Sequence, residues 1–223
     1  MLTGEAVVAI WNDIPNDTRD QFYDWHVNEH MSERVGIPGF RRGRRYIALD
    51  SASTQPEFFT LYELDTMQVA QGMDYASRLN DPTPATTHVT SRFQNTVRTL
   101  SRVLVSHGPG SGGVLLTIRF GCDAQHLPGL KALVRAAGQA ARVTGAHLCQ
   151  GDAAASSKPT AEYRGRTDIQ PPPDCFLMIE ATDADALSQI MLDRAMTGAG
   201  ATGPYERGVY RLEYTRTKTG FAP

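Results

Sequence analysis

The sequence predicts an α+β fold in which one order of elements, β-α-β-β-α-β, occurs twice. Runs of β-branched and aromatic residues alternate with segments of helical periodicity. The order found in residues 1–107 returns in residues 113–223. The glycine-rich residues 108–112 lie between the two halves and are expected to form a linker.

The first half begins with a strand, EAVVAIWN, followed by a helix. Thr18 and Gln21 have the spacing of a capping box, and Gly36 and Pro38 mark the end of that helix. Two β-rich runs separated by the turn-like DSASTQP predict a hairpin. The expected strands are residues 5–12, 40–49, 57–64 and 95–107, and the expected second helix is residues 67–79.

The second half repeats this order with a weaker pattern. Its expected strands are residues 114–120, 145–150, 175–181 and 207–217, and its expected helices are residues 127–143 and 184–196. Residues 151–174 interrupt the central hairpin and are either a disordered excursion or a lid. Two strings that fit G-x-G-x-x-G, residues 108–113 and 198–203, are interpreted as loops, because neither follows a strand and opens a helix.

This order of elements is that of the ferredoxin-like fold. Four antiparallel strands bury one face under two helices and leave the other face in need of a cover. Two such sheets in one chain can cover each other, which predicts tandem ferredoxin-like repeats packed as a closed or half-closed barrel. A single irregular α+β domain is the alternative.

Composition excludes several classes of function. The formal net charge is −2 and the pI is about 6.3, so no charge pattern favours nucleic acid or an anionic membrane. No run of eighteen apolar residues is present, and the N-terminus lacks the pattern of a signal peptide. Cys122, Cys149 and Cys175 have no C-x-x-C spacing and predict neither a disulfide framework nor a zinc ribbon. A cytoplasmic protein is expected.

The first helix carries the clearest chemical signal. His26 and His30 are four residues apart, so they lie on one helix face beside large apolar side chains. Glu29 and Glu33 are their neighbours, and Trp25 lies just beyond them. A histidine near its ordinary pKa can exchange a proton at neutral pH, and a nearby carboxylate would raise that pKa and orient the ring.

A metal site is the alternative reading of this helix. HVNEH fits H-x-x-E-H, in which two histidines bind zinc. A catalytic zinc needs a third protein ligand, and only Asp74 and Glu63 are at hand. We therefore expect no metal and no organic cofactor. The third alternative is that the histidines are structural.

The arginine-rich strand GFRRGRRY follows the histidine helix. Alternation puts Phe40, Arg42, Arg44 and Tyr46 on one face. Arg44 and Tyr46 are the expected pocket residues, because an arginine fork can bind a carboxylate or an enolate. Tyr62 would join them if its face of the strand 57–64 looks into the barrel, and Arg98 with Arg102 on the last strand of this half are weaker candidates.

Residues 18–46 resemble the EthD-type branch of the dimeric α/β-barrel superfamily, with a tryptophan- and histidine-rich first helix, then proline-glycine and an arginine-rich strand. The resemblance implies a homodimer and a small hydrophobic ligand held between sheet and helices. The family's helix histidine falls on His30, and its upstream aromatic position falls on Trp25 or His26. Relatives in the superfamily include cofactor-free isomerases, decarboxylases and monooxygenases, and also haem-degrading enzymes.

Together these observations favour a cofactor-independent lyase, isomerase or decarboxylase that transfers a proton on a small aromatic or carboxylated metabolite. His30 is the expected acid or base, with His26 and Glu33 as its partners, and Arg44 with Tyr46 stabilise the anion. Trp25, Glu29, Tyr62 and Arg98 are the expected substrate-binding residues. The alternatives are a metal-dependent hydrolase or lyase that uses His26 and His30, and a non-catalytic ligand-binding or assembly protein.

Overall fold

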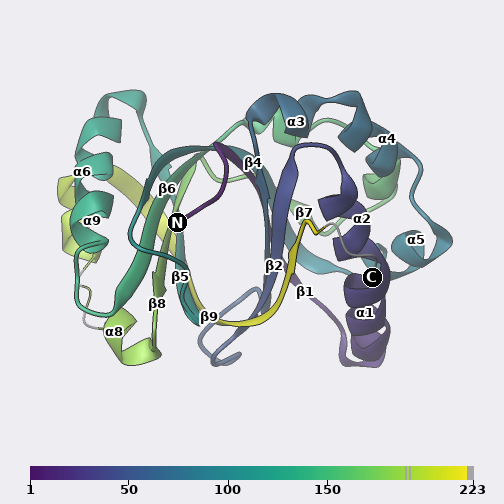
Figure 1. Ribbon diagram of the computed structural model, residues 1–223, viewed down its shortest axis with the longest axis horizontal. Coiled ribbons are helices and arrows are strands. Elements are labelled where there is room, and N and C mark those ends of the chain that lie inside the picture. Colours follow the sequence, from purple (N-terminus) through teal and green to yellow (C-terminus); the bar gives the residue numbers. More distant parts are fainter. Residues whose placement is uncertain (189, 191, 220–223) are drawn as a thin grey trace.

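Antiparallel strands close into a barrel that lies between two layers of helices in the computed structural model (Figure 1). The structure describes residues 1–188, 190 and 192–219. The strands are β1 (Ala6–Asp13), β2 (Phe40–Ala48), β3 (Phe58–Leu64), β4 (Gln94–His107), β5 (Val114–Cys122), β6 (Val143–Gly151), β7 (Ile169–Gln170), β8 (Cys175–Ala181) and β9 (Ala201–Thr217). They are ordered β1-β3-β2-β9-β5-β8-β6-β4, and pairing of β4 with β1 closes the ring.

Each half of the chain contributes four adjacent strands. The first half gives the order β4-β1-β3-β2, and the second gives β9-β5-β8-β6, which is the same ferredoxin-like arrangement. The halves join where β2 pairs with β9 and where β4 pairs with β6. The predicted α+β fold with tandem repeats is confirmed. The division into residues 1–107, 108–112 and 113–223 stays a prediction.

Helices cover the outer faces of the barrel on opposite sides (Figure 1). They are α1 (Arg19–Trp25), a π-helical turn (His26–His30), α2 (Met31–Gly36), α3 (Met67–Gln71), α4 (Met73–Asn80), α5 (Pro84–Thr90), α6 (Leu127–Ala137), α7 (Ala153–Ser156), α8 (Ala184–Ser188) and α9 (Asp193–Gly198), with 3₁₀ turns at Asn16–Thr18, Ala124–His126 and Ala161–Tyr163. Figure 1 shows α1–α5 on one side and α6, α8 and α9 on the other.

Several helices differ in length from the prediction. Residues 67–79 form two helices, because Gly72 between them takes an extended conformation. Thr18 does not form a capping box, because its hydroxyl donates to Asp17 instead of accepting from the helix. Residues 127–143 are helical only to Ala137. The predicted helix 184–196 crosses residues 189 and 191, which lie outside the described residues.

The barrel interior holds both an aromatic cluster and a cluster of buried charges. Trp11 packs against Phe59 and Phe176, with ring centroids 4.8 and 5.2 Å apart, so side chains from both halves fill the barrel. The guanidinium of Arg44 lies between two buried carboxylates. Its Nη2 is 3.0 Å from Glu63 Oε1, and its Nη1 is 2.8 Å from Glu180 Oε2.

Further hydrogen bonds complete this ionic cluster. Glu63 also pairs with Arg42, and Glu180 accepts from the backbone N–H of Gly112. His147 Nε2 lies 3.1 Å from Glu180 Oε1. Burial alone would raise the pKa of Glu180, but the hydrogen bond with His147 and the charge of Arg44 outweigh it and lower the pKa to about 2. Glu180 therefore stays ionised at neutral pH.

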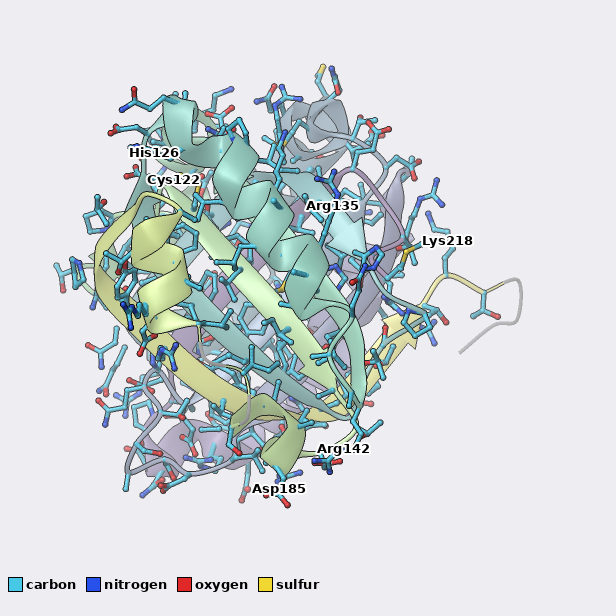
Figure 2. All side chains as sticks on the ribbon, turned by 90° about the vertical axis from the view of Figure 1, so that its left-hand side faces the viewer. Cys122, His126, Arg135, Arg142, Asp185 and Lys218 are labelled. Atoms are coloured by element: carbon cyan, nitrogen blue, oxygen red, sulfur yellow. A yellow bond between two sulfur atoms is a disulfide. The ribbon has the colours of Figure 1, made fainter. Side chains whose placement is uncertain are left out.

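A disulfide joins Cys122 on β5 to Cys175 on the neighbouring strand β8. The cysteine spacing did not predict it, because strand pairing brings together residues that are 53 apart in sequence. In the view of Figure 2, Cys122 lies near His126, just before α6. Cys149 is free and buried. None of the described helices has the length and apolar character needed to cross a bilayer.

Replacing Arg44 by leucine should destabilise the protein by about 3–5 kcal/mol, because two buried carboxylates would then lose their shared cation. Urea unfolding measures this change. Arg41→Leu on the same strand is the matched control. Arg41 is exposed and pairs with Asp65 at the surface, so its loss should cost at most about 1 kcal/mol. Equal losses in the two variants would show that Arg44 does not hold the halves together.

Candidate functional site

The two histidines of the first helix lie on a π-helical turn. HVNEH, residues His26–His30, forms this turn between α1 and α2, and the N–H of Met31 donates to the carbonyl of His26 five residues earlier. Such wide turns are rare and occur often at functional sites. Both side chains are buried, with 3% of His26 and 5% of His30 exposed. The shared face expected from their spacing is present, with ring centroids 5.7 Å apart.

Aromatic rings surround the histidines. The His30 ring lies 4.2 Å from the ring of Trp25 at an interplanar angle of 34°, and the His26 ring lies 5.2 Å from Phe22. Tyr62 on β3 meets His30 edge-on, at 6.3 Å. Trp25 is held in place because its indole N–H donates to Thr86 on α5. The predicted residues Trp25, His30 and Tyr62 therefore lie together.

A small cavity lies between this helix and the outer face of β1, β3 and β4. It leaves about 30 Å³ for the centres of water molecules, which is enough for about two waters. His26, His30 and Tyr62 line it, and so do Asn12 and Phe93, which the sequence did not single out. The remaining lining combines aromatic rings with threonines and two charged side chains, those of Glu162 and Arg166.

Three buried polar atoms at this cavity have no hydrogen-bond partner among the residues that the structure describes. They are Nδ1 of His30, Oη of Tyr62 and Nδ2 of Asn12. A buried polar atom without a partner costs about 1–3 kcal/mol, so such atoms are rare in native proteins. Their convergence on one cavity is the arrangement expected where a polar group of a ligand binds.

Burial lowers the pKa of both His26 and His30 well below the ordinary value. The charges of Arg45 and Arg34 lower the pKa of His26 further, and Arg34 does so for His30. Both imidazoles are therefore neutral at pH 7. The expected rise in pKa does not occur, because the carboxylates bind elsewhere.

Glu29 and Glu33 lie beside the histidine helix without contacting the rings. Glu29 accepts hydrogen bonds from Thr83 and Thr86, and Glu33 pairs with Arg34 at 2.9 Å. The structure thus does not bring Glu33 to His30 as an orienting partner. Glu29 acts on the site only through Thr86, which also holds Trp25.

Arg44 and Tyr46 point into the barrel, on the opposite face of the sheet from His30. A bulge between Phe40 and Arg42 shifts the alternation, so Phe40 packs under the helices while Arg44 and Tyr46 face inward. Alternation alone predicted that Phe40 would share their face, but Phe40 lies on the opposite face. The structure separates the two expected anion-stabilising residues from the histidines.

Arg45 takes the place beside the helix. Its Nη1 lies 3.3 Å from Nδ1 of His26, and its guanidinium lies 4.6 Å from the ring centroid of Tyr23 and pairs with Glu213. An arginine can only donate, so Nδ1 of His26 accepts and the ring proton is on Nε2. The sequence missed Arg45 because the bulge that turns it toward the helix leaves no local signal.

The segment Gly151–Asp174 is ordered and lies over the cavity, which Glu162, Tyr163 and Arg166 help to line. Glu162 on its 3₁₀ turn pairs with Arg34 at 3.1 Å. Arg166 donates to Thr96 on β4 and lies 5.3 Å from the ring centroid of Phe93. Short β7 adds to β4 in parallel. The second half of the chain thus covers the site of the first.

The second half has no equivalent site on α6. Figure 2 shows α6 lying across its sheet, with His126 at its start and Arg135 toward its other end. The α6 residues buried against the sheet are Leu130, Val134 and Ala137, all aliphatic. The first half instead buries His26, His30 and Arg34 at this position.

No group of three histidine, cysteine, aspartate or glutamate side chains in residues 1–188, 190 and 192–219 has the geometry of a metal site. Neither expected third ligand faces the histidines. Asp74 is exposed on α4, and Glu63 lies inside the barrel.

Protein purified without chelator should contain well under one zinc, iron or manganese per chain, because His26 and His30 have no third side-chain ligand within the described part of the chain. Elemental analysis by mass spectrometry measures the metal content. Stoichiometric metal that disappears in His26→Ala would instead support the metal-dependent alternative.

Long-range ¹H–¹⁵N NMR should show His26 and His30 neutral at pH 6, because their folded pKa values lie below that of an unfolded histidine. The unfolded chain gains protons at these positions as the pH falls through about 6.5, while the folded chain does not. The free energy of unfolding should therefore decrease as the pH is lowered through this range. The decrease should be less steep in a His26→Gln, His30→Gln double variant. Charged rings at pH 6 would contradict the assignment.

No protein-family model matches the chain, and no curated protein matches it. Among solved structures, it resembles an anthrone oxidase-like protein with a TM-score of 0.65, at 11% identity over 95% of this chain and 92% of that one. It also resembles candidate monooxygenases from Fusobacterium nucleatum (TM-score 0.56, 9% identity, 99% and 98% covered) and from Lactobacillus acidophilus (TM-score 0.57, 9% identity, 96% of each chain covered). These likenesses show a shared α+β fold of the ferredoxin-like type with an antiparallel barrel.

Proposed function

We propose that the protein is an enzyme that binds a small aromatic or carboxylated metabolite in the His30 cavity and transfers a proton on it without an organic cofactor. The observation that carries the proposal is the convergence of three unpartnered polar atoms on a buried, aromatic-walled cavity. The cavity has room for about two waters, and Trp25 and Phe93 meet edge-to-face with ring centroids 6.2 Å apart, so binding requires the covering segment Gly151–Asp174 to move outward. The ring of the ligand would then lie against Trp25 and Phe93, and the polar atoms would fix its orientation.

His30 is the proposed base. Its imidazole is neutral at pH 7, so a ring nitrogen carries a lone pair, and Nδ1 has no partner among the side chains and backbone that the structure describes. In the proposed step Nδ1 takes a proton from a C–H group activated by a carbonyl. The electron pair of that bond moves to the carbonyl oxygen and leaves an oxyanion.

Tyr62 and Asn12 would stabilise this oxyanion. Burial raises the pKa of Tyr62, although the charge of Arg34 opposes the rise, so the phenol stays protonated and can donate. Asn12 offers a second N–H through Nδ2. The positive charge of Arg34 acts to lower the pKa of both His30 and Tyr62, but Arg34 is itself paired with Glu33 and Glu162, so Tyr62 and Asn12 are the proposed oxyanion donors.

The fold neighbours suggest the kind of substrate. One is described as anthrone oxidase-like, and an anthrone is an aromatic ketone whose deprotonation at carbon gives a phenolate-type oxyanion. Return of the proton to another atom gives an isomerase, and loss of a leaving group gives a lyase or a decarboxylase. We extend the proposal to an EthD-type relationship, a homodimer and a cytoplasmic location. The barrel closes within one chain, so the proposed step does not need a second copy.

Wild-type protein should accelerate deuterium exchange at the acidic carbon of anthrone in D₂O under nitrogen, followed by proton NMR. His30→Ala should lower the exchange rate by about 10²–10⁴-fold, because the proposed base is lost. Tyr62→Phe should lower it by about 10²–10³-fold through loss of an oxyanion donor. Exclusion of oxygen keeps exchange separate from any oxidation.

The matched control is His88→Ala, which removes an exposed histidine on α5 that bonds only to Gln21. It should exchange at the wild-type rate. Thermal melting verifies that each variant is folded. If folded His30→Ala exchanges anthrone at the wild-type rate, His30 is a structural residue and not the base. Binding of anthrone without exchange would instead support the non-catalytic alternative.

A further inference from the structure

Arg98 on β4 is a buried arginine without a carboxylate partner. Only 7% of it is exposed. Its Nη2 donates to the hydroxyl of Tyr75 at 3.0 Å, and its guanidinium lies 5.5 Å from the ring centroid of Tyr163. The other buried arginines in the part of the chain that the structure describes each have a carboxylate at 2.8–3.3 Å; they are Arg34, Arg44, Arg45 and Arg119.

A buried charge without a counter-ion is unfavourable, since desolvation is then not offset by an ion pair. Neutral tyrosines offset it only in part, through a hydrogen bond and cation–π contacts. Arg98 thus has the surroundings of a residue whose anion comes from outside the chain.

Two cavities meet at Arg98. They leave about 130 and about 350 Å³ for the centres of water molecules, and both are lined by Arg98, Lys158 and Pro159. Neither is lined by an aspartate or a glutamate among the described residues. The smaller has apolar walls at Leu79 and Leu100, and proline side chains line the larger.

We propose that Arg98 and Lys158 form a binding site for the carboxylate of an aromatic ligand. The planar fork of Arg98 matches a carboxylate. Lys158 is exposed at the rim, where it attracts the anion. Phosphate shares this oxyanion chemistry, but the apolar walls and the single buried fork favour a carboxylate on a hydrocarbon body.

Tyr163 places the new site next to the His30 cavity, because it lines both that cavity and the larger one at Arg98. A ligand held by its carboxylate at Arg98 would therefore extend toward His30. This extension rests on the proposed function, whereas the binding site itself does not.

The test is calorimetric binding of 2-naphthoate and of its neutral analogue 2-naphthamide. Arg98→Met should weaken naphthoate binding by about 10- to 100-fold, since a charge-assisted hydrogen-bond pair is lost. Arg98→Lys should recover only part of the affinity, because the fork is missing. Arg102→Met is the control. Arg102, which the sequence suggested as a second pocket residue, is exposed on the same face of β4 and lines neither cavity, so this variant makes the same change in charge and should bind as the wild type does.

A purely structural Arg98 would behave differently. Without ligand, Arg98→Met should melt no earlier than the wild type, because it removes an uncompensated buried cation. Naphthoate should raise the melting temperature of the wild type and of Arg102→Met, but not of Arg98→Met. If Arg98→Met melts early, naphthoate binding is compared between the wild type and Arg98→Lys, which keeps the charge but lacks the fork.

Equal naphthoate affinity in the wild type and Arg98→Met, or equal binding of naphthoate and naphthamide by the wild type, would overturn the proposal. Displacement of naphthoate by millimolar inorganic phosphate would overturn the assignment to a carboxylate. Failure here is distinct from failure of the proposed function. If anthrone exchange persists while naphthoate does not bind, only the Arg98 site is disproved. If naphthoate binds while anthrone does not exchange, only the proposed His30 chemistry is disproved.

Discussion

The ion pairs of Arg44 with Glu63 and Glu180 set the geometry of the whole chain. Glu63 belongs to the first half and Glu180 to the second, so one guanidinium joins the two sheets across the barrel. Because Arg44 must point inward to meet both carboxylates, its neighbours Gly43 and Arg45 must point outward, toward the helices. Side chains added at Gly43 would collide with Met31, so the glycine lets the helix approach the sheet closely.

Strands and their order were predictable because they depend on local alternation of apolar and polar residues. The shared face of His26 and His30 was predictable for the same reason, since residues four apart are neighbours on any helix. The π-helical turn was not, because nothing in HVNEH distinguishes it from an ordinary helical turn. The separation of Phe40 from Arg44 and Tyr46 was also missed, since one bulge after Phe40 reverses the alternation for the remainder of β2.

Contacts between segments far apart in sequence were beyond the reach of local patterns. Glu162 and Arg166 lie in a loop-rich segment of the second half, and only the closed barrel brings them to Arg34 and Thr96. The same holds for Asn12 near the end of β1, because only the folded chain brings it into one cavity with Tyr62 and His30. The first half thus provides the groups of the proposed site, while the second provides the segment that covers them.

Covalent continuity between the halves also has an evolutionary consequence. In a barrel assembled from two copies of a shorter polypeptide, every substitution is made twice, and both sites must tolerate it. Here a mutation alters one half alone. The segment between β6 and β8 can therefore grow longer and cover one cavity, while no matching segment forms in the other half. The surface between α6 and its sheet can independently become aliphatic. Fusion turns a symmetric assembly into one whose halves are inherited together but specialise separately.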